Sequence, residues 1–234
     1  MIRSKRLVAV LGLCAAVLAL VVFGTSASQA EKGANWMVNG TNVNATLLPV
    51  VQIKEVENKM MALVGATKSG TKVEVACTGA QFLNAKLEPE GTVSAGNVTK
   101  FTGCVTKLNG VISSACSPKT KGEEKGVVVS EPLIGLIVLH EGKALVKFTP
   151  VTGTTFVNFI FGEACSLGEE VPVTGTSTVK DSKGEFGVEL VDHLVEQGPL
   201  SSLTFCGTPA VVVGGAILNL TGVHTGLKWS ALPA

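Results

Sequence analysis

Beyond residue 30, apolar and polar residues alternate along short stretches of the chain. In Lys72–Cys77, the side chains of Val73, Val75 and Cys77 fall on one face, which is the pattern of a half-buried β-strand. Runs that are apolar on both faces predict central strands covered on both sides. These runs are Val127–Val129, Leu133–Leu139 and Thr155–Phe161.

Turn-forming clusters of Gly, Pro, Asn and Ser, such as Asn109-Gly110 and Gly207–Pro209, separate these runs at intervals of about 8–15 residues. Many short strands at this spacing predict an all-β fold. We expect a mostly antiparallel β-sandwich or barrel-like domain from about Val38 to Trp229, with at most short helices. Helical spacing of apolar residues is weak, and the two candidate helices are Glu55–Val64 and Val188–Gln197.

One five-residue sequence occurs twice. Pro150–Thr154 reads Pro-Val-Thr-Gly-Thr, and Pro172–Thr176 repeats it. A duplicated binding loop is one interpretation. We favour a turn that is used twice, because Pro fixes φ and Gly permits positive φ.

The first thirty residues have the features of an export signal. Three basic residues precede the apolar run Leu7–Phe23, and the segment ends in Ser28-Gln29-Ala30. This order predicts a secretory signal peptide in residues 1–30, with the mature chain beginning at or near Glu31. An uncleaved anchor is the alternative, but a bilayer core asks for about 20 apolar residues. We therefore expect a chain that is secreted or held at the cell envelope, with no membrane span after cleavage. Its β-rich domain covers residues 31–234, with a candidate separate part from about residue 180.

The charge of the chain gives no sign of a charged partner. It carries 19 Lys and Arg against 18 Asp and Glu, and residues 1–30 hold three of the basic and none of the acidic residues, so the rest has a formal charge of −2. With 5% aromatic residues as well, it lacks the positive field and the stacking rings that nucleic-acid binding uses. We expect no nucleic-acid partner. The partner is unknown, and a cell-surface or extracellular one is the candidate.

Five cysteines follow residue 30, and an odd number leaves at least one thiol outside any disulfide. They are Cys77, Cys104, Cys116, Cys165 and Cys206. Exported chains use spaced cysteines mainly for structural disulfides. Cys104 and Cys116 flank Asn109-Gly110, the strongest short hairpin signal. An ideal two-residue turn places Cys104 opposite Ala115, and one bulge or a three-residue loop corrects the register. We therefore predict a Cys104–Cys116 disulfide.

Part of the chain resembles a group of bacterial exported proteins of unassigned function. Their shared order is Cys, Phe-Thr-Gly-Cys, Cys, a Val- and Leu-rich strand pair, Thr-Pro-x-x-Gly-Thr-x-Phe, Cys and Val-x-Val-Thr-Gly. Here these stand as Cys77, Phe101–Cys104, Cys116, Val127–Leu139, Thr149–Phe156, Cys165 and Val171–Gly175. The resemblance covers mainly Val73–Val179. It implies an extracellular β-rich fold, a Cys77–Cys165 disulfide and a free Cys206, with Cys165–Cys206 as the alternative. It implies no activity.

Patterns for catalysis or metal binding are sparse, and we predict no catalytic, metal-binding or cofactor-binding residues and no cofactor. His140, His193 and His224 lack metal-binding spacing, so we interpret them as surface or turn histidines. Asp192-His193 with a distant serine would be a triad only if the fold gathered them, and adjacent strand residues point to opposite faces.

The remaining candidates also have simpler structural interpretations. The adjacent pairs Glu123-Glu124 and Glu169-Glu170 are typical of solvated charges rather than glycosidase carboxylates. Gly214-Gly215 indicates a strand kink or bulge rather than a phosphate loop. Trp36 and Trp229 would close one end of a sandwich if the terminal strands pair, and a ligand platform is the alternative.

Three functions are consistent with these observations. The leading hypothesis is a non-catalytic exported β-domain with a structural or binding role. The second is a β-barrel carrier of an apolar ligand, and the third is an exported hydrolase with an unrecognised site. A closed core favours the first, and an apolar pocket of about several hundred Å³ favours the second. A cleft that gathers His193 with Glu and Ser favours the third.

Overall fold

The structure is a computed structural model that describes residues 34–54, 61–182 and 186–232. Within these ranges it contains 22 strands and two short 3₁₀ turns, Ser114–Cys116 and Gly222–His224. The strand pairs are antiparallel. The prediction of an all-β, antiparallel fold is therefore confirmed. The predicted signal peptide lies outside the described residues.

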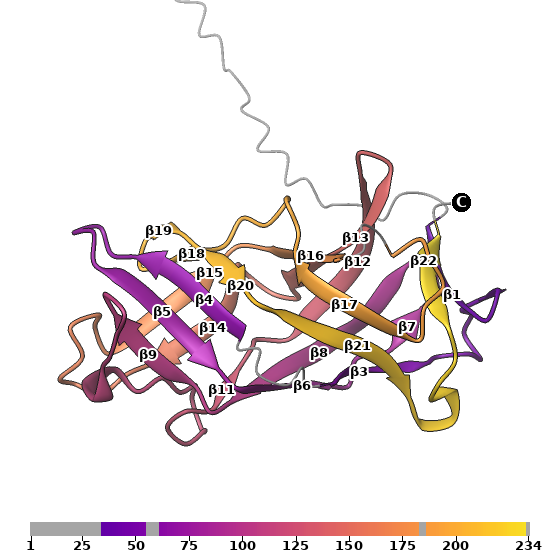
Figure 1. Cartoon of the computed structure of the whole chain (residues 1–234). Helices are drawn as coiled ribbons and strands as arrows, with labels where there is room; N and C mark the ends of the chain where they lie inside the picture. Colours follow the sequence, from indigo (N-terminus) through magenta and orange to yellow (C-terminus); the bar gives the residue numbers. More distant parts are fainter. Residues whose placement is uncertain (1–33, 55–60, 183–185, 233–234) are drawn as a thin grey trace, which may run out of the picture.

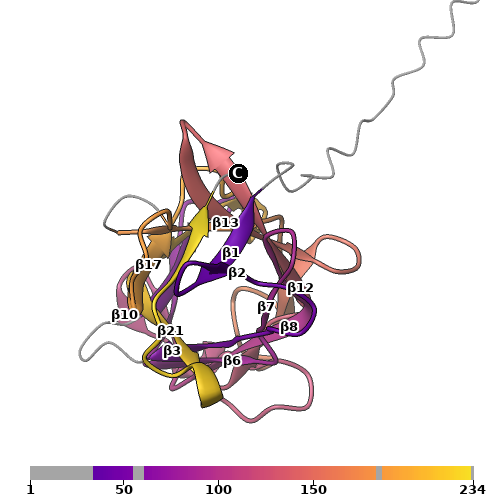
Figure 2. The ribbon, with the colours of Figure 1, turned by 90° about the vertical axis from the view of Figure 1, so that its right-hand side faces the viewer.

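The largest sheet has ten strands and curls into a barrel-like half of the molecule, which Figure 2 shows end-on. The order along it is β11-β8-β12-β13-β16-β17-β21-β3, and β6 and β7 also pair with β8. Val51 N donates to Ala85 O at 2.9 Å and Leu87 N donates to Pro49 O at 2.8 Å, so β3 joins the segment between β6 and β7. The sheet thus returns onto itself. Its strands are β3 (Val50–Lys54), β6 (Gly79–Leu83), β7 (Leu87–Glu88), β8 (Thr92–Thr102), β11 (Val128–Val129), β12 (Leu133–His140), β13 (Lys143–Pro150), β16 (Ser177–Asp181), β17 (Asp192–Gln197) and β21 (Gly215–Thr221).

A three-stranded sheet lies at one end of this barrel-like half (Figure 1). It consists of β2 (Thr41–Asn42), β1 (Asn35–Val38) and β22 (Trp229–Leu232). The terminal strands pair with each other, and Trp36 and Trp229 are each 1% exposed with ring centroids 5.6 Å apart. The Trp36 indole N–H donates to Thr92 O at 2.9 Å. Both tryptophans belong to the core, so their role is packing rather than a surface platform.

The other half of the molecule is a sandwich of two smaller sheets. One consists of β10 (Val111–Ile112), β9 (Val105–Leu108), β5 (Lys72–Cys77), β4 (Met61–Ala66) and β20 (Val211–Val213) in that order. The other consists of β14 (Thr155–Ile160), β15 (Glu170–Thr174), β18 (Thr204–Phe205) and β19 (Thr208–Pro209). The barrel-like half has one hydrophobic cluster, which includes Ile137, Val146 and Leu218. A second cluster joins the two sandwich sheets, and in it Val73 and Val75 belong to the first sheet and Phe159 and Phe205 to the second. Inward-facing positions of both sheets thus supply one core.

Several strands pass from one half to the other as continuous ribbons. Ala76 on β5 pairs with Val105 on β9, and Gly79 on β6 pairs with Thr102 on β8. The segment β5–β6 therefore pairs with the segment β8–β9 in one register on both sides of the bend between the halves. At the bend, Gly103 has a φ of +60°, and a Cβ there would lie 2.1 Å from Thr78 Oγ1. This close approach requires glycine.

Two other sequence features lie at such bends. β20 ends at Val213 and β21 begins at Gly215, with Gly214 at a φ of +94° between them, so the predicted kink is confirmed. The two copies of the five-residue repeat lie where β13 gives way to β14 and β15 gives way to β16, and Gly175 N donates to Thr154 O at 2.9 Å. These positions support the turn interpretation of the repeat.

Some local expectations were wrong. The described part of the first candidate helix, Met61–Val64, belongs to strand β4, and Asp192–Gln197, in the second candidate helix, is strand β17. Residues 55–60 lie outside the described residues. Both strands have partners on two sides, and these ladders outweigh weak helical periodicity. Among the runs predicted as central strands, β12 is central, whereas β11 and β14 are the end strands of their sheets.

Candidate functional site

An apolar cavity of about 160 Å³ lies where the barrel-like half meets the sandwich half. Phe82, Phe148 and Leu218 line it from the ten-stranded sheet, and Val75 and Phe159 line it from the two sandwich sheets. These residues belong to the two hydrophobic clusters, one in each half. The cavity is therefore the place where two cores meet without filling the space between them, and it is partly open to solvent.

Strand pairing places a hydroxyl residue beside each of two aromatic rings in the wall. Phe82 on β6 pairs with Thr99 on β8, and Phe148 on β13 pairs with Ser177 on β16. Directly paired residues of an antiparallel ladder point to the same face. The ring centroids of Phe82 and Phe148 are 6.4 Å apart, so the two pairs meet in one part of the wall.

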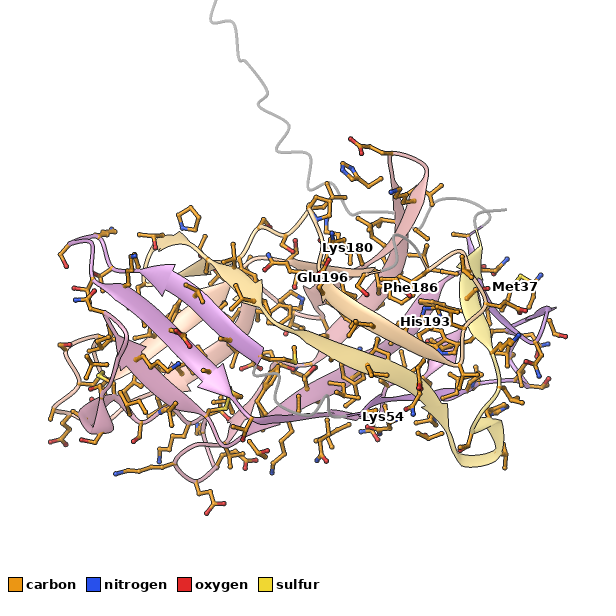
Figure 3. All side chains as sticks on the ribbon, in the orientation of Figure 1. Met37, Lys54, Lys180, Phe186, His193 and Glu196 are labelled. Atoms are coloured by element: carbon orange, nitrogen blue, oxygen red, sulfur yellow. A yellow bond between two sulfur atoms is a disulfide. The ribbon has the colours of Figure 1, made fainter. Side chains whose placement is uncertain are left out.

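Polar side chains of β17 lie at the edge of the cavity and already have partners. Gln197 Oε1 accepts a hydrogen bond from Val212 N. Glu196 forms an ion pair with Lys180 at 3.1 Å, and both side chains are partly exposed (Figure 3). The rest of the wall is apolar apart from the hydroxyl residues Thr99, Ser130 and Ser177. Such a wall favours an apolar molecule through the hydrophobic effect.

Sequence reasoning did not mark this cavity. Of the residues it singled out for chemistry, Cys77, Gly214 and Gly215 line the cavity. The other lining residues occupy inward-facing positions of strands. A filled core would have the same sequence pattern at such positions. At about 160 Å³ the cavity is also smaller than the pocket we expected of a carrier. It matches a ligand of about one ring in size.

The four cysteines predicted to form disulfides do form two, but with different partners. The bonds are Cys77–Cys104 and Cys116–Cys165, so the predicted pairs Cys104–Cys116 and Cys77–Cys165 are wrong. Cys206 is free, as expected. Two disulfides are consistent with an oxidising, extracellular location.

The predicted hairpin is present, but it does not bring its flanking cysteines together. Val111 pairs with Leu108 around Asn109-Gly110, whose φ angles of +49° and +85° define a regular two-residue turn. No bulge follows, because β10 ends at Ile112 and Cys116 lies in a 3₁₀ turn beyond the ladder. Cys104 instead bonds to Cys77 on the other side of β9, next to the Ala76–Val105 pair.

Cys206 is a half-buried thiol in the turn between β18 and β19. Burial raises the pKa of the Cys206 thiol above its ordinary value of 9.0, because the thiolate loses hydration. Since the thiolate is the nucleophile, we expect iodoacetamide to alkylate Cys206 more slowly in the folded protein than in urea. The midpoint of the rise of the folded rate with pH should also lie above 9.0. Mass spectrometry of the Cys206 peptide across pH measures both effects, and a midpoint at or below pH 9.0 would contradict the raised pKa.

His193 is a buried core residue, which corrects its interpretation as a surface or turn histidine. Its side chain is fully buried on β17. Nδ1 lies 2.7 Å from Asp181 Oδ2, and Nε2 donates to the Trp229 carbonyl at 2.8 Å. Its ring lies against that of Trp229, with a centroid distance of 4.2 Å. It also lies against the ring of Phe186, with a centroid distance of 5.3 Å (Figure 3). Both ring nitrogens are engaged within the core, so the histidine joins β16, β17 and β22.

The triad interpretation finds no support in this arrangement. Asp192 points to the opposite side of the strand and forms a partly exposed ion pair with Lys54 at 3.6 Å. The partner of His193 Nδ1 is Asp181, and Nε2 is engaged by the Trp229 carbonyl. A catalytic base needs a free nitrogen within reach of a substrate.

The other charged candidates are surface groups. Glu123 forms an ion pair with Lys100 at 3.2 Å, and Glu170 accepts a hydrogen bond from Asn158. His140 and His224 are half-buried and lie in β12 and in the second 3₁₀ turn. Within the described ranges, no three His, Cys, Asp or Glu residues are grouped as a metal site. No helix in the described part of the chain has the length and apolar character needed to cross a membrane.

Comparisons with protein families, curated proteins and solved structures found no match to this chain. The resemblance to bacterial exported proteins therefore stays a prediction.

Proposed function

We propose that the chain is an exported, non-catalytic binding protein of the cell envelope or extracellular space that holds a small apolar molecule in the cavity between its two halves. The observation that carries this proposal is the apolar cavity of about 160 Å³. Because of this cavity, we favour the second hypothesis, a carrier of an apolar ligand, over a purely structural domain.

The size and lining of the cavity support this function. An engineered protein cavity of about 150 Å³ lined by Leu, Ile and Phe stays dry and binds benzene. Here Phe82, Phe148 and Leu218 supply a similar wall. A molecule of about one ring would fill the space and restore the packing contacts that the wall lacks.

Three observations support export of the chain. Residues 1–30 have the composition of a secretory signal peptide. The two disulfides are stable in oxidising compartments outside the cytosol. The resemblance over Val73–Val179 supports a bacterial envelope or secreted protein, whose partner would be extracellular.

Titration with toluene tests the proposed function. At about 0.7 kcal/mol for each of its seven carbon atoms, toluene should bind with a Kd of about 0.2 mM. Calorimetry should show one saturable site. Ala216→Phe should abolish binding, because Ala216 is a buried residue of the cavity wall on β21.

The control is Ala95→Phe, which adds the same ring at an exposed position on β8. It should bind toluene as the wild-type protein does. If wild-type protein binds no toluene, or if Ala216→Phe binds it unchanged, the proposed function is wrong.

A further inference from the structure

Two hydroxyl side chains in the cavity wall lack hydrogen-bond partners. Thr99 and Ser177 line the cavity, and each is 7% exposed. Their neighbour Ser130 also lines it, but its hydroxyl accepts from Thr99 N at 2.9 Å and donates to Glu131 O at 2.9 Å. Among the described residues, no group hydrogen-bonds the hydroxyls of Thr99 and Ser177. A buried hydroxyl without a partner is costly, so this wall has unused hydrogen-bonding capacity.

These two hydroxyls differ from others that also lack partners. Thr106 Oγ1 and Ser230 Oγ are sealed from solvent, and neither residue lines the cavity. The Thr99 and Ser177 oxygens are not sealed in this way. The cavity is the open space that both residues line, so their hydroxyls are available to a molecule inside it.

Strand pairing explains why the two hydroxyls would serve one ligand. Thr99 stands beside Phe82, and Ser177 stands beside Phe148, and the two rings lie against each other. A ring that packs on this aromatic pair would carry its substituents toward the hydroxyls. A charged substituent would be disfavoured, because the wall is apolar and burying an unpaired charge is costly.

We infer that the cavity ligand is an uncharged molecule of about one ring that carries a hydroxyl or carbonyl oxygen, which Thr99 and Ser177 bind through hydrogen bonds. This inference rests on the proposed function and deepens it by naming the chemical class of the ligand. Thr99 and Ser177 are then the residues that select an oxygenated ring over a hydrocarbon of the same shape.

The test compares p-cresol with toluene, which differ by one hydroxyl. In the Thr99→Val/Ser177→Ala double variant, the affinity for p-cresol relative to toluene should fall about two- to ten-fold, the equivalent of one lost hydrogen bond. The affinity for toluene itself should stay within two-fold. The matched control is Thr106→Val/Ser230→Ala, which removes two unpartnered hydroxyls outside the cavity and should leave the ratio unchanged.

A second readout uses the unmodified protein, so it does not depend on folding of the variants. Nuclear Overhauser effects should connect the p-cresol ring protons to side-chain protons of Thr99 or Ser177. If toluene binds in the cavity but the ratio does not change in the double variant, or these effects are absent, the inference is wrong and the proposed function stands. If toluene does not bind the wild-type protein, both the proposed function and this inference are wrong.

Discussion

Replacing His193 with alanine is expected to lower the free energy of unfolding by about 3–5 kcal/mol. The change removes a buried imidazole from contact with Asp181 at 2.7 Å and takes the hydrogen-bond donor from the Trp229 carbonyl. It also opens a hole between Trp229 and Phe186, whose rings pack on the histidine. Because the chain has 234 residues, a loss of this size corresponds to a fall in Tm of about 10 °C.

Urea unfolding followed by circular dichroism measures this loss. Circular dichroism is preferable to tryptophan fluorescence here, because Trp229 itself contacts the deleted ring. The control is His140→Ala. The His140 side chain is half-buried and has no hydrogen bond to the described part of the chain, so its removal should lower the free energy of unfolding by less than about 0.5 kcal/mol. If His193→Ala loses less than about 1 kcal/mol, the histidine is not a structural link between the strands.

The fold class was predictable because strand alternation is a local property. Val73, Val75 and Cys77 alternate within six residues, and the structure places them in β5 as expected. The location of a strand within its sheet is not local in this sense. The runs Leu133–Leu139 and Thr155–Phe161 are both apolar on both faces. Nevertheless β12, formed by the first run, is central, and β14, formed by the second, is an end strand. The difference depends on which distant segments pair with each strand.

The candidate site was harder to predict for the same reason. The cavity arises where bent ribbons separate two cores, and its wall uses the same residue types as a filled core. The burial of His193 depends on Asp181 from β16 and on the Trp229 carbonyl from β22. The spacing of the histidines along the sequence does not reveal that His193 will meet an aspartate and a backbone carbonyl from other strands. Asn109-Gly110 did predict its hairpin, because that turn sets the register of its own two strands.

Removing the Cys77–Cys104 disulfide by the double substitution Cys77→Ala/Cys104→Ala is expected to lower the free energy of unfolding by about 3–4 kcal/mol. The bond joins residues 27 positions apart, and closing a loop of that length restricts the unfolded chain by about this amount. The bond also lies beside the bend at Thr78 and Gly103, where both strands of a ribbon leave one half for the other. Removing the Cys116–Cys165 disulfide, which joins residues 49 positions apart, should cost about 4 kcal/mol in the same model.

Urea unfolding of the two double variants measures these losses. The control is Cys206→Ala, which removes a free and half-buried thiol, closes no loop, and should cost less than about 1 kcal/mol. The single variant Cys77→Ala then tests the pairing itself. It should make Cys104 available to iodoacetamide in urea without a reductant, while Cys116 and Cys165 stay protected as a linked peptide pair. If Cys165 becomes reactive instead, Cys77 pairs with Cys165, and the bond across the Asn109-Gly110 hairpin is again the candidate for Cys104.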